Sequence, residues 1–123
     1  MIDKRGVQNS SMVLLVFRGE YDLASKEQLR KDFSALVDEA SVVLDFSGVT
    51  YFDSTVIEEL VWLLNAREAA GRERETLVLN NPRLLRILEM LDLSRLLRIV
   101  PSLDDVIGRD GRSVQVRYAT VED

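Results

Sequence analysis

The most informative stretch of this sequence is VLDFSGVTYFDST, residues 43–55. It begins within the segment VVLDF at 42–46, whose shortness and β-forming residues predict a buried strand. Residues 47–49 (Ser-Gly-Val) are expected to leave this strand. Further on, apolar residues recur at the spacing of one helix face, at Ile57, Leu60, Val61 and Leu64. The stretch therefore predicts a buried strand that passes through a loop into an amphipathic helix.

The same alternation of strand and helix continues on both sides. The apolar run at 12–17 predicts a strand buried on both faces. We expect strands near residues 12–17, 42–46, 76–79 and 98–100, and helices near residues 25–40, 55–70, 82–92 and 102–107. Because such alternation requires crossover connections, it predicts an α/β fold. The expected architecture is a mostly parallel sheet of four to five strands with four helices largely on one side.

Turn and capping residues set the expected boundaries. Residues 18–22 have the composition of a turn, and Gly71 lies where the second helix would be capped. Asn80-Asn81-Pro82 predicts a helix start with an asparagine cap and proline in the first turn. Two pairs have the spacing of a capping box, namely Ser25 with Gln28 and Thr55 with Glu58.

The C-terminal segment at 109–123 extends past the predicted domain at 1–108. Within it, apolar and polar residues alternate from Val114 to Ala119, which predicts an extra edge strand at 113–119. This strand would pair with the chain's own sheet or with a neighbour's by strand addition, so both a monomer and a homodimer remain open. The alternative is a frayed C-terminus. Near the other end, Ile2 and Val7 are compatible with a short first strand.

Composition excludes several classes of function. The sequence contains no cysteine and no histidine, so disulfides, thiol catalysis, Cys/His zinc sites and a histidine base are ruled out. A net charge of −5 without a basic cluster argues against a nucleic-acid partner. The longest apolar run, at 12–17, is too short to cross a bilayer, and residues 1–6 lack the core of a secretion signal. We expect a cytoplasmic domain without membrane insertion, metal or cofactor.

Four stretches together resemble the STAS family, which includes bacterial anti-sigma factor antagonists and related domains of sulfate transporters. The stretches are 18–23 with Leu29 and Arg30, 43–55, 77–80 and 88–103. Residues 43–55 are the most specific of the four. The resemblance implies a regulatory protein-binding module that binds an anti-sigma factor of the serine/threonine kinase type. In that case ATP belongs to the partner, and the chain itself has no Gly-rich phosphate loop.

The resemblance also implies a site in the loop before the second helix. In the family, a partner kinase phosphorylates the residue that follows Asp-Ser, which here is Thr55, with Ser54 as a second candidate. A phosphate there would lie at a helix N-terminus, where N–H groups and the helix dipole favour an anion. Thr55 is expected to be exposed and close to the turn at Asp22. The expected partner-binding residues are Asp22, Asp53, Ser54, Thr55, Val56, Glu58 and Glu59.

Departures from the family pattern keep a second function open. The family has a glycine, an apolar residue and a small residue after the phosphorylated position, whereas this sequence has Val56, Ile57 and Glu58. Glu58 and Glu59 would also repel a phosphate. These residues favour a STAS docking subunit of a larger assembly, such as a lipid-transport ATPase or a stress-sensing complex, that is never phosphorylated. An enzyme is not expected, because Asp22 and Asp53 have no evident pocket or second catalytic group around them.

Overall fold

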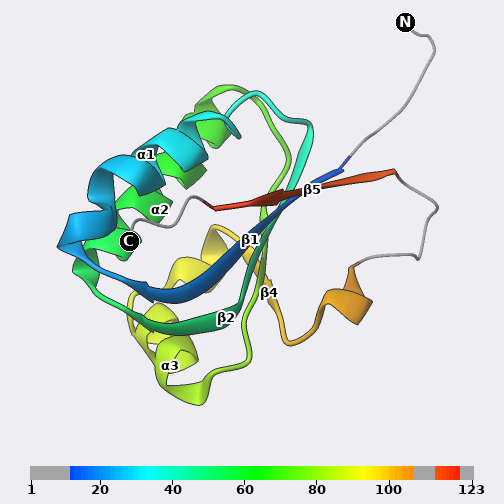
Figure 1. Cartoon of the computed structure of the whole chain (residues 1–123). Helices are drawn as coiled ribbons and strands as arrows, with labels where there is room; N and C mark the ends of the chain where they lie inside the picture. Colours follow the sequence, from blue (N-terminus) through cyan, green and yellow to red (C-terminus); the bar gives the residue numbers. More distant parts are fainter. Residues whose placement is uncertain (1–11, 107–112, 120–123) are drawn as a thin grey trace, which may run out of the picture.

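A computed structural model describes residues 12–106 and 113–119 of the 123-residue chain (Figure 1). Within these residues, five parallel strands form one sheet in the order β4-β3-β2-β1-β5. The strands are β1 (Met12–Tyr21), β2 (Ser41–Phe52), β3 (Thr76–Val78), β4 (Arg98–Val100) and β5 (Val114–Tyr118). The predicted α/β fold with a parallel sheet is confirmed. Ile2 and Val7 lie outside the described residues.

The C-terminal edge strand is present as β5, which runs parallel to β1. Met12 lies opposite Val114 and Val16 lies opposite Tyr118. The alternation in the sequence predicted this strand because every second side chain of a strand points to the same face of the sheet. Its partner is the chain's own β1.

Strands β1 and β2 are longer than predicted. Residues 18–21 continue β1, and residues 47–52 continue β2, where a turn and a loop were expected. The two strands pair as far as Tyr21 and Phe52, with two irregularities in the register that accommodate the extra residues. At one of them, a side chain on Gly48 would approach the Phe17 carbonyl oxygen to 3.3 Å, so the close strand approach favours glycine there.

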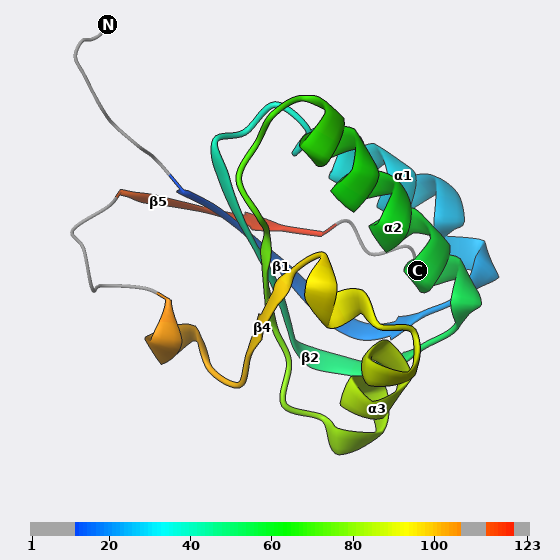
Figure 2. The same ribbon diagram turned by 180° about the vertical axis from the view of Figure 1, so that it is seen from behind.

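Three α-helices are found in the described part of the chain, and they cover one face of the sheet (Figure 2). They are α1 (Lys26–Ser34), α2 (Ser54–Ala69) and α3 (Pro82–Met90). The fourth predicted helix, at 102–107, is not an α-helix in its described residues, which end at 106: they form a 3₁₀ turn, η3 (Leu103–Asp105), which lies on the opposite face. Asn81 caps α3 by accepting from the amides of Arg83 and Leu84, which confirms the predicted helix start.

The sheet separates two apolar layers. The larger layer lies under the helices and contains an aromatic cluster in which Phe17 contacts Tyr21, Phe33 and Phe46 edge to face. The smaller layer lies on the face opposite α1–α3, here called the far face. Its buried residues are Met12, Leu14, Val43 and Val78, and Leu103 and Val106 pack against them. Among the described residues, η3 and Val106 thus cover part of the far face.

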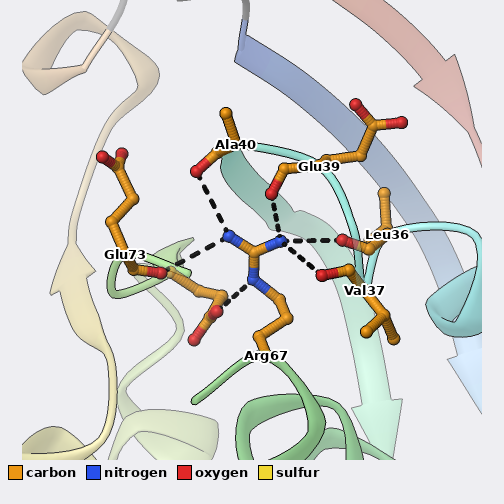
Figure 3. Close-up of polar contacts among 7 residues, drawn as sticks. Leu36, Val37, Glu39, Ala40, Arg67 and Glu73 are labelled. Carbon is orange, nitrogen blue, oxygen red and sulfur yellow. Dashed lines mark hydrogen bonds and ion pairs between the residues drawn. The ribbon is translucent and has the colours of Figure 1, made fainter. Parts of the chain in front are cut away.

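A fully buried arginine lies at the C-terminal end of α2. Arg67, in the last turn of α2, is 0% exposed, and its Nε donates to the Glu75 carboxylate just before β3. Figure 3 shows its guanidinium surrounded by carbonyl oxygens of the segment between α1 and β2. The distances to the Leu36 and Glu39 oxygens are 2.7 and 2.6 Å. Arg67 therefore ties α2, the α1–β2 connection and the entry to β3 together.

Candidate functional site

The site predicted from the sequence lies where β1 and β2 end. Tyr21 and Phe52, the last residues of these strands, are opposite each other in the register. Asp22 and Asp53 follow them directly, so the two carboxylates occupy equivalent positions at the carboxyl edge of the sheet. The predicted proximity of the Asp22 turn and the start of α2 follows from this pairing. Carboxyl ends of parallel strands commonly form binding sites in α/β proteins.

Asp53 is the N-cap of α2. Its carboxylate accepts a hydrogen bond of 2.9 Å from the Thr55 amide, and its carbonyl oxygen accepts one of 3.1 Å from the Val56 amide. The helix therefore begins at Ser54, two residues before the start that a Thr55 cap would give. The capping box predicted for Thr55 and Glu58 is wrong, because Asp53 already has the extended backbone and the oxygen that a cap requires.

This earlier start buries the predicted phosphorylation position. Thr55 is the second residue of α2 and is only 7% exposed, so the prediction of an exposed Thr55 is wrong. Its neighbour Ser54, the first residue of the helix, is exposed. The hydroxyl accessible to a partner at this helix start is thus that of Ser54.

Asp22 has the same role on the neighbouring loop. It caps a 3₁₀ turn, η1 (Leu23–Ser25), by accepting 3.0 Å from the Ala24 amide, while the Ser25 hydroxyl accepts 3.2 Å from the Asp22 amide. The predicted capping box of Ser25 with Gln28 is wrong, since Ser25 is paired back to Asp22. Both loops of the site are therefore ordered by an aspartate whose carboxylate accepts a hydrogen bond from the amide two residues later.

The predicted partner-binding residues divide into two groups. Val56 and Glu59 are buried together with Thr55, so none of the three presents a free surface. Glu59 accepts a hydrogen bond of 2.5 Å from Arg30 of α1, and the Arg30 guanidinium lies 4.2 Å from the centre of the Trp62 ring. The exposed or partly exposed members are Asp22, Asp53, Ser54 and Glu58.

Two exposed apolar side chains at this edge were missed by the sequence analysis. Leu23 in η1 is 69% exposed and Tyr51 near the end of β2 is 49% exposed. The available signal was their position next to the aspartates and outside the apolar stripes, with Leu23 directly after Asp22 and Tyr51 two residues before Asp53. We call the set Asp22, Leu23, Tyr51 and Ser54 the loop surface. It combines apolar, acidic and hydroxyl groups, which suits contact with a protein.

Tyr21 is the buried residue that directly precedes Asp22 of the loop surface. Its ring is buried beside Phe17, and its hydroxyl accepts a hydrogen bond of 3.2 Å from the Arg18 amide. Burial raises the pKa of Tyr21 above its ordinary value of 10.0, the Arg18 amide opposes this, and Asp32 adds to it. Tyr21 is therefore neutral near pH 7 and holds the end of β1 in place.

Other kinds of site are not found in the described residues. No group of three or more acidic side chains within residues 12–106 and 113–119 is arranged to hold a metal ion. No helix in the same residues is long and apolar enough to span a bilayer.

Several solved structures share this fold. An anti-sigma factor antagonist from Mycobacterium paratuberculosis superposes with a TM-score of 0.61 at 21% identity, over 74% of this chain and 80% of that one. The Bacillus cell fate determinant SpoIIAA in its phosphorylated form gives 0.59 at 17% identity, over 75% and 86%. The anti-sigma factor antagonist SpoIIAA in its unphosphorylated form gives 0.59 at 16% identity, over 74% and 81%. No curated protein matches the sequence.

The family comparison covers most of the chain. The family described as "Mlab, STAS domain" matches residues 6–101, which include β1 to β4, all three helices and the loop surface. The strand order and the helices on one face agree with this match. The chain belongs to the STAS domain family.

Proposed function

We propose that this chain is an anti-sigma factor antagonist, a regulatory module that binds an anti-sigma factor through the loop surface. The observation that carries the proposal is the exposure of Leu23 and Tyr51 beside the capped loops of Asp22 and Asp53. Exposed apolar side chains surrounded by polar groups are typical of protein-binding surfaces. The solved antagonists with the same fold support this choice of partner.

Phosphorylation, if the partner is a serine/threonine kinase, is proposed at Ser54. Ser54 is exposed at the first position of α2, whereas Thr55 is buried. Glu59 is paired with Arg30, which reduces the repulsion that this carboxylate would exert on a phosphate. A phosphate on Ser54 would add about 1.5 to 2 negative charges beside Asp22 and Asp53 and would weaken binding to an acidic or apolar partner surface. That SpoIIAA is known in a phosphorylated form supports such a switch.

A second candidate is a docking subunit of a larger assembly that is not phosphorylated. The burial of Thr55 supports it, because a kinase could reach that hydroxyl only after the start of α2 had opened. The same loop surface would then be a permanent contact. The two candidates differ in the modification and in the identity of the partner.

The test uses the intact chain and a kinase-type anti-sigma factor from the same genome. Calorimetric titration should show binding that Leu23→Asp and Tyr51→Ala each weaken about tenfold or more, equivalent to about 1.4 kcal/mol. Met90→Ala, which removes an even more exposed apolar side chain on α3, should bind normally. No binding by the unmodified chain, or equal losses in all three variants, would contradict the proposal.

Mass spectrometry after incubation with that partner and ATP separates the two candidates. The antagonist hypothesis predicts one phosphate, which should be absent in Ser54→Ala. It should be retained in Ser94→Ala, which changes an exposed serine elsewhere in the chain. Binding without any phosphate would favour the docking subunit.

A further inference from the structure

The outer edge of β5 has a defined backbone pattern. The Met12 amide donates to the Ser113 carbonyl oxygen and the Ala119 amide donates to the Val16 carbonyl oxygen, at 3.0 and 2.9 Å. Since backbone groups alternate in direction along a strand, odd-numbered residues of β5 face β1. Val114, Val116 and Tyr118 therefore direct their N–H and C=O groups outward. Within the part of the chain that the structure describes, no strand pairs with this edge.

The same three residues place their side chains on the far face. They lie opposite Met12, Leu14 and Val16 in the register, which belong to the apolar layer of that face. Val116 is 49% exposed and Tyr118 is 64% exposed. An open edge with exposed apolar residues and no proline or lysine is favourable for strand addition.

The polar residues of β5 do not obstruct that edge. Arg117 lies on the helical side, where it donates 3.0 Å to Glu39 and 3.1 Å to the Gln115 side chain. Its charge is therefore balanced within the chain. Tyr118 is held by the Arg18 guanidinium, which lies 5.3 Å from its ring centre.

We propose that this edge binds a second copy of the chain, through antiparallel pairing of β5 with β5 across a twofold axis at Val116. In this register Val116 faces its own copy and Val114 faces Tyr118, so all outward backbone groups of the strand are paired. Gln115 then faces Arg117 of the partner, and no like charges meet. If the twofold axis lay at Arg117 instead, Arg117 would face Arg117 of the other copy. If it lay at Gln115, fewer residues of the two strands would be paired. The strand is thus self-complementary in its backbone, and the pairing places no like charges opposite each other.

The pairing has a geometric consequence. A twofold axis perpendicular to the sheet joins two five-stranded sheets into one and continues the far face from one copy to the other. Because the paired strands run in opposite directions, the two loop surfaces lie at opposite ends of the dimer. Each copy would keep its own partner site, so the pairing is independent of the proposed function.

The first test measures mass in solution. The unmodified chain should show twice its monomer mass of 14.0 kDa at high concentration, by light scattering after gel filtration. Val116→Pro removes an outward amide that β1 does not use, so it should raise the dimer dissociation constant at least tenfold while the circular dichroism spectrum stays unchanged. A monomer at every concentration, or a dimer that Val116→Pro does not weaken, would overturn the proposal.

The second test checks the register by cross-linking, so it does not depend on a variant that weakens the dimer. Because the sequence contains no cysteine, Val116→Cys introduces a single thiol. Residues opposite each other in a hydrogen-bonded antiparallel pair lie about 5.5 Å apart between Cα atoms, within the range of a disulfide. Mild oxidation should cross-link Val116→Cys into a dimer far faster than Ser94→Cys, an exposed control outside β5. Equal cross-linking rates would contradict this register.

Discussion

The two ends of α2 each carry a charged residue, but one is buried and the other lies at the surface. At its C-terminal end, Arg67 is fully buried and bonded to Glu75 and to several carbonyl oxygens of the α1–β2 connection. At its N-terminal end, Asp53 is partly exposed and bonds only local backbone, beside the exposed Ser54. A charge in the interior must be satisfied completely, whereas a surface cap leaves its neighbours accessible. One end of the helix is therefore bonded into the interior, and the other leaves polar side chains exposed at the surface.

The largest expected effect follows from breaking the buried end. Arg67→Met should lower the free energy of unfolding by about 3–5 kcal/mol, because it leaves the Glu75 carboxylate buried without its partner. Urea denaturation of the purified variant measures the loss. Arg72→Ala is the matched control, since Arg72 makes only a 3.8 Å surface pair with Asp38. Equal losses in the two variants would remove the contrast between buried and exposed charge.

A smaller effect is expected at the N-terminal end of α2. Asp53→Ala removes the N-cap of α2 and should cost about 1 kcal/mol in unfolding free energy. Thr55→Val removes the Thr55 hydroxyl but keeps the size of this buried side chain. Because Asp53 is the N-cap, the helix should still begin at Ser54, which amide chemical shifts would show. A larger loss in Thr55→Val than in Asp53→Ala would mean that Thr55, after all, holds the helix start.

Alkaline pH should weaken the support beneath the loop surface. The pKa of Tyr21 is raised in the folded state, so the folded protein holds this proton more tightly than the unfolded chain. Its contribution to stability is complete below about pH 10 and falls as the pH rises through the folded pKa. Thermal unfolding at pH 9 and above should show a shallower decline for Tyr21→Phe than for the unmodified chain. Equal declines in thermal stability for the two proteins would exclude ionisation of Tyr21 as the cause.

The smallest effect on stability is expected at the loop surface itself. Leu23→Asp should change the unfolding free energy by less than about 0.5 kcal/mol, because Leu23 is mostly exposed. Chemical denaturation gives this value directly. A loss of several kcal/mol would show that Leu23 is a folding residue, and its effect on binding would then have to be interpreted as unfolding.

The sequence predicted those features that depend on local pattern. The strand at 42–46 and the alternation from Val114 to Ala119 are carried by neighbouring side chains, and both strands formed. The length of β1 was not predictable in this way, because residues 18–21 are held by pairing with β2 and not by their own apolar character.

The site was predictable in position but not in detail. Asp53 and Thr55 are both good N-caps, and only the end of β2 at Phe52 decides that Asp53 takes the role and Thr55 is buried. Arg67 gave no signal, because its carbonyl partners Leu36 and Glu39 lie 31 and 28 positions earlier in the sequence. Contacts of that range depend on how the helices pack, which sequence spacing does not encode.

Hydrogen exchange with and without a kinase-type anti-sigma factor tests the central contrast most directly. We predict increased protection in peptides that cover Asp22 and Leu23 and in those that cover Tyr51 to Ser54, with no change around Arg67 and residues 36–40. Protection confined to the Arg67 region and residues 36–40, with none at the loop surface, would contradict the assignment of the two ends of α2.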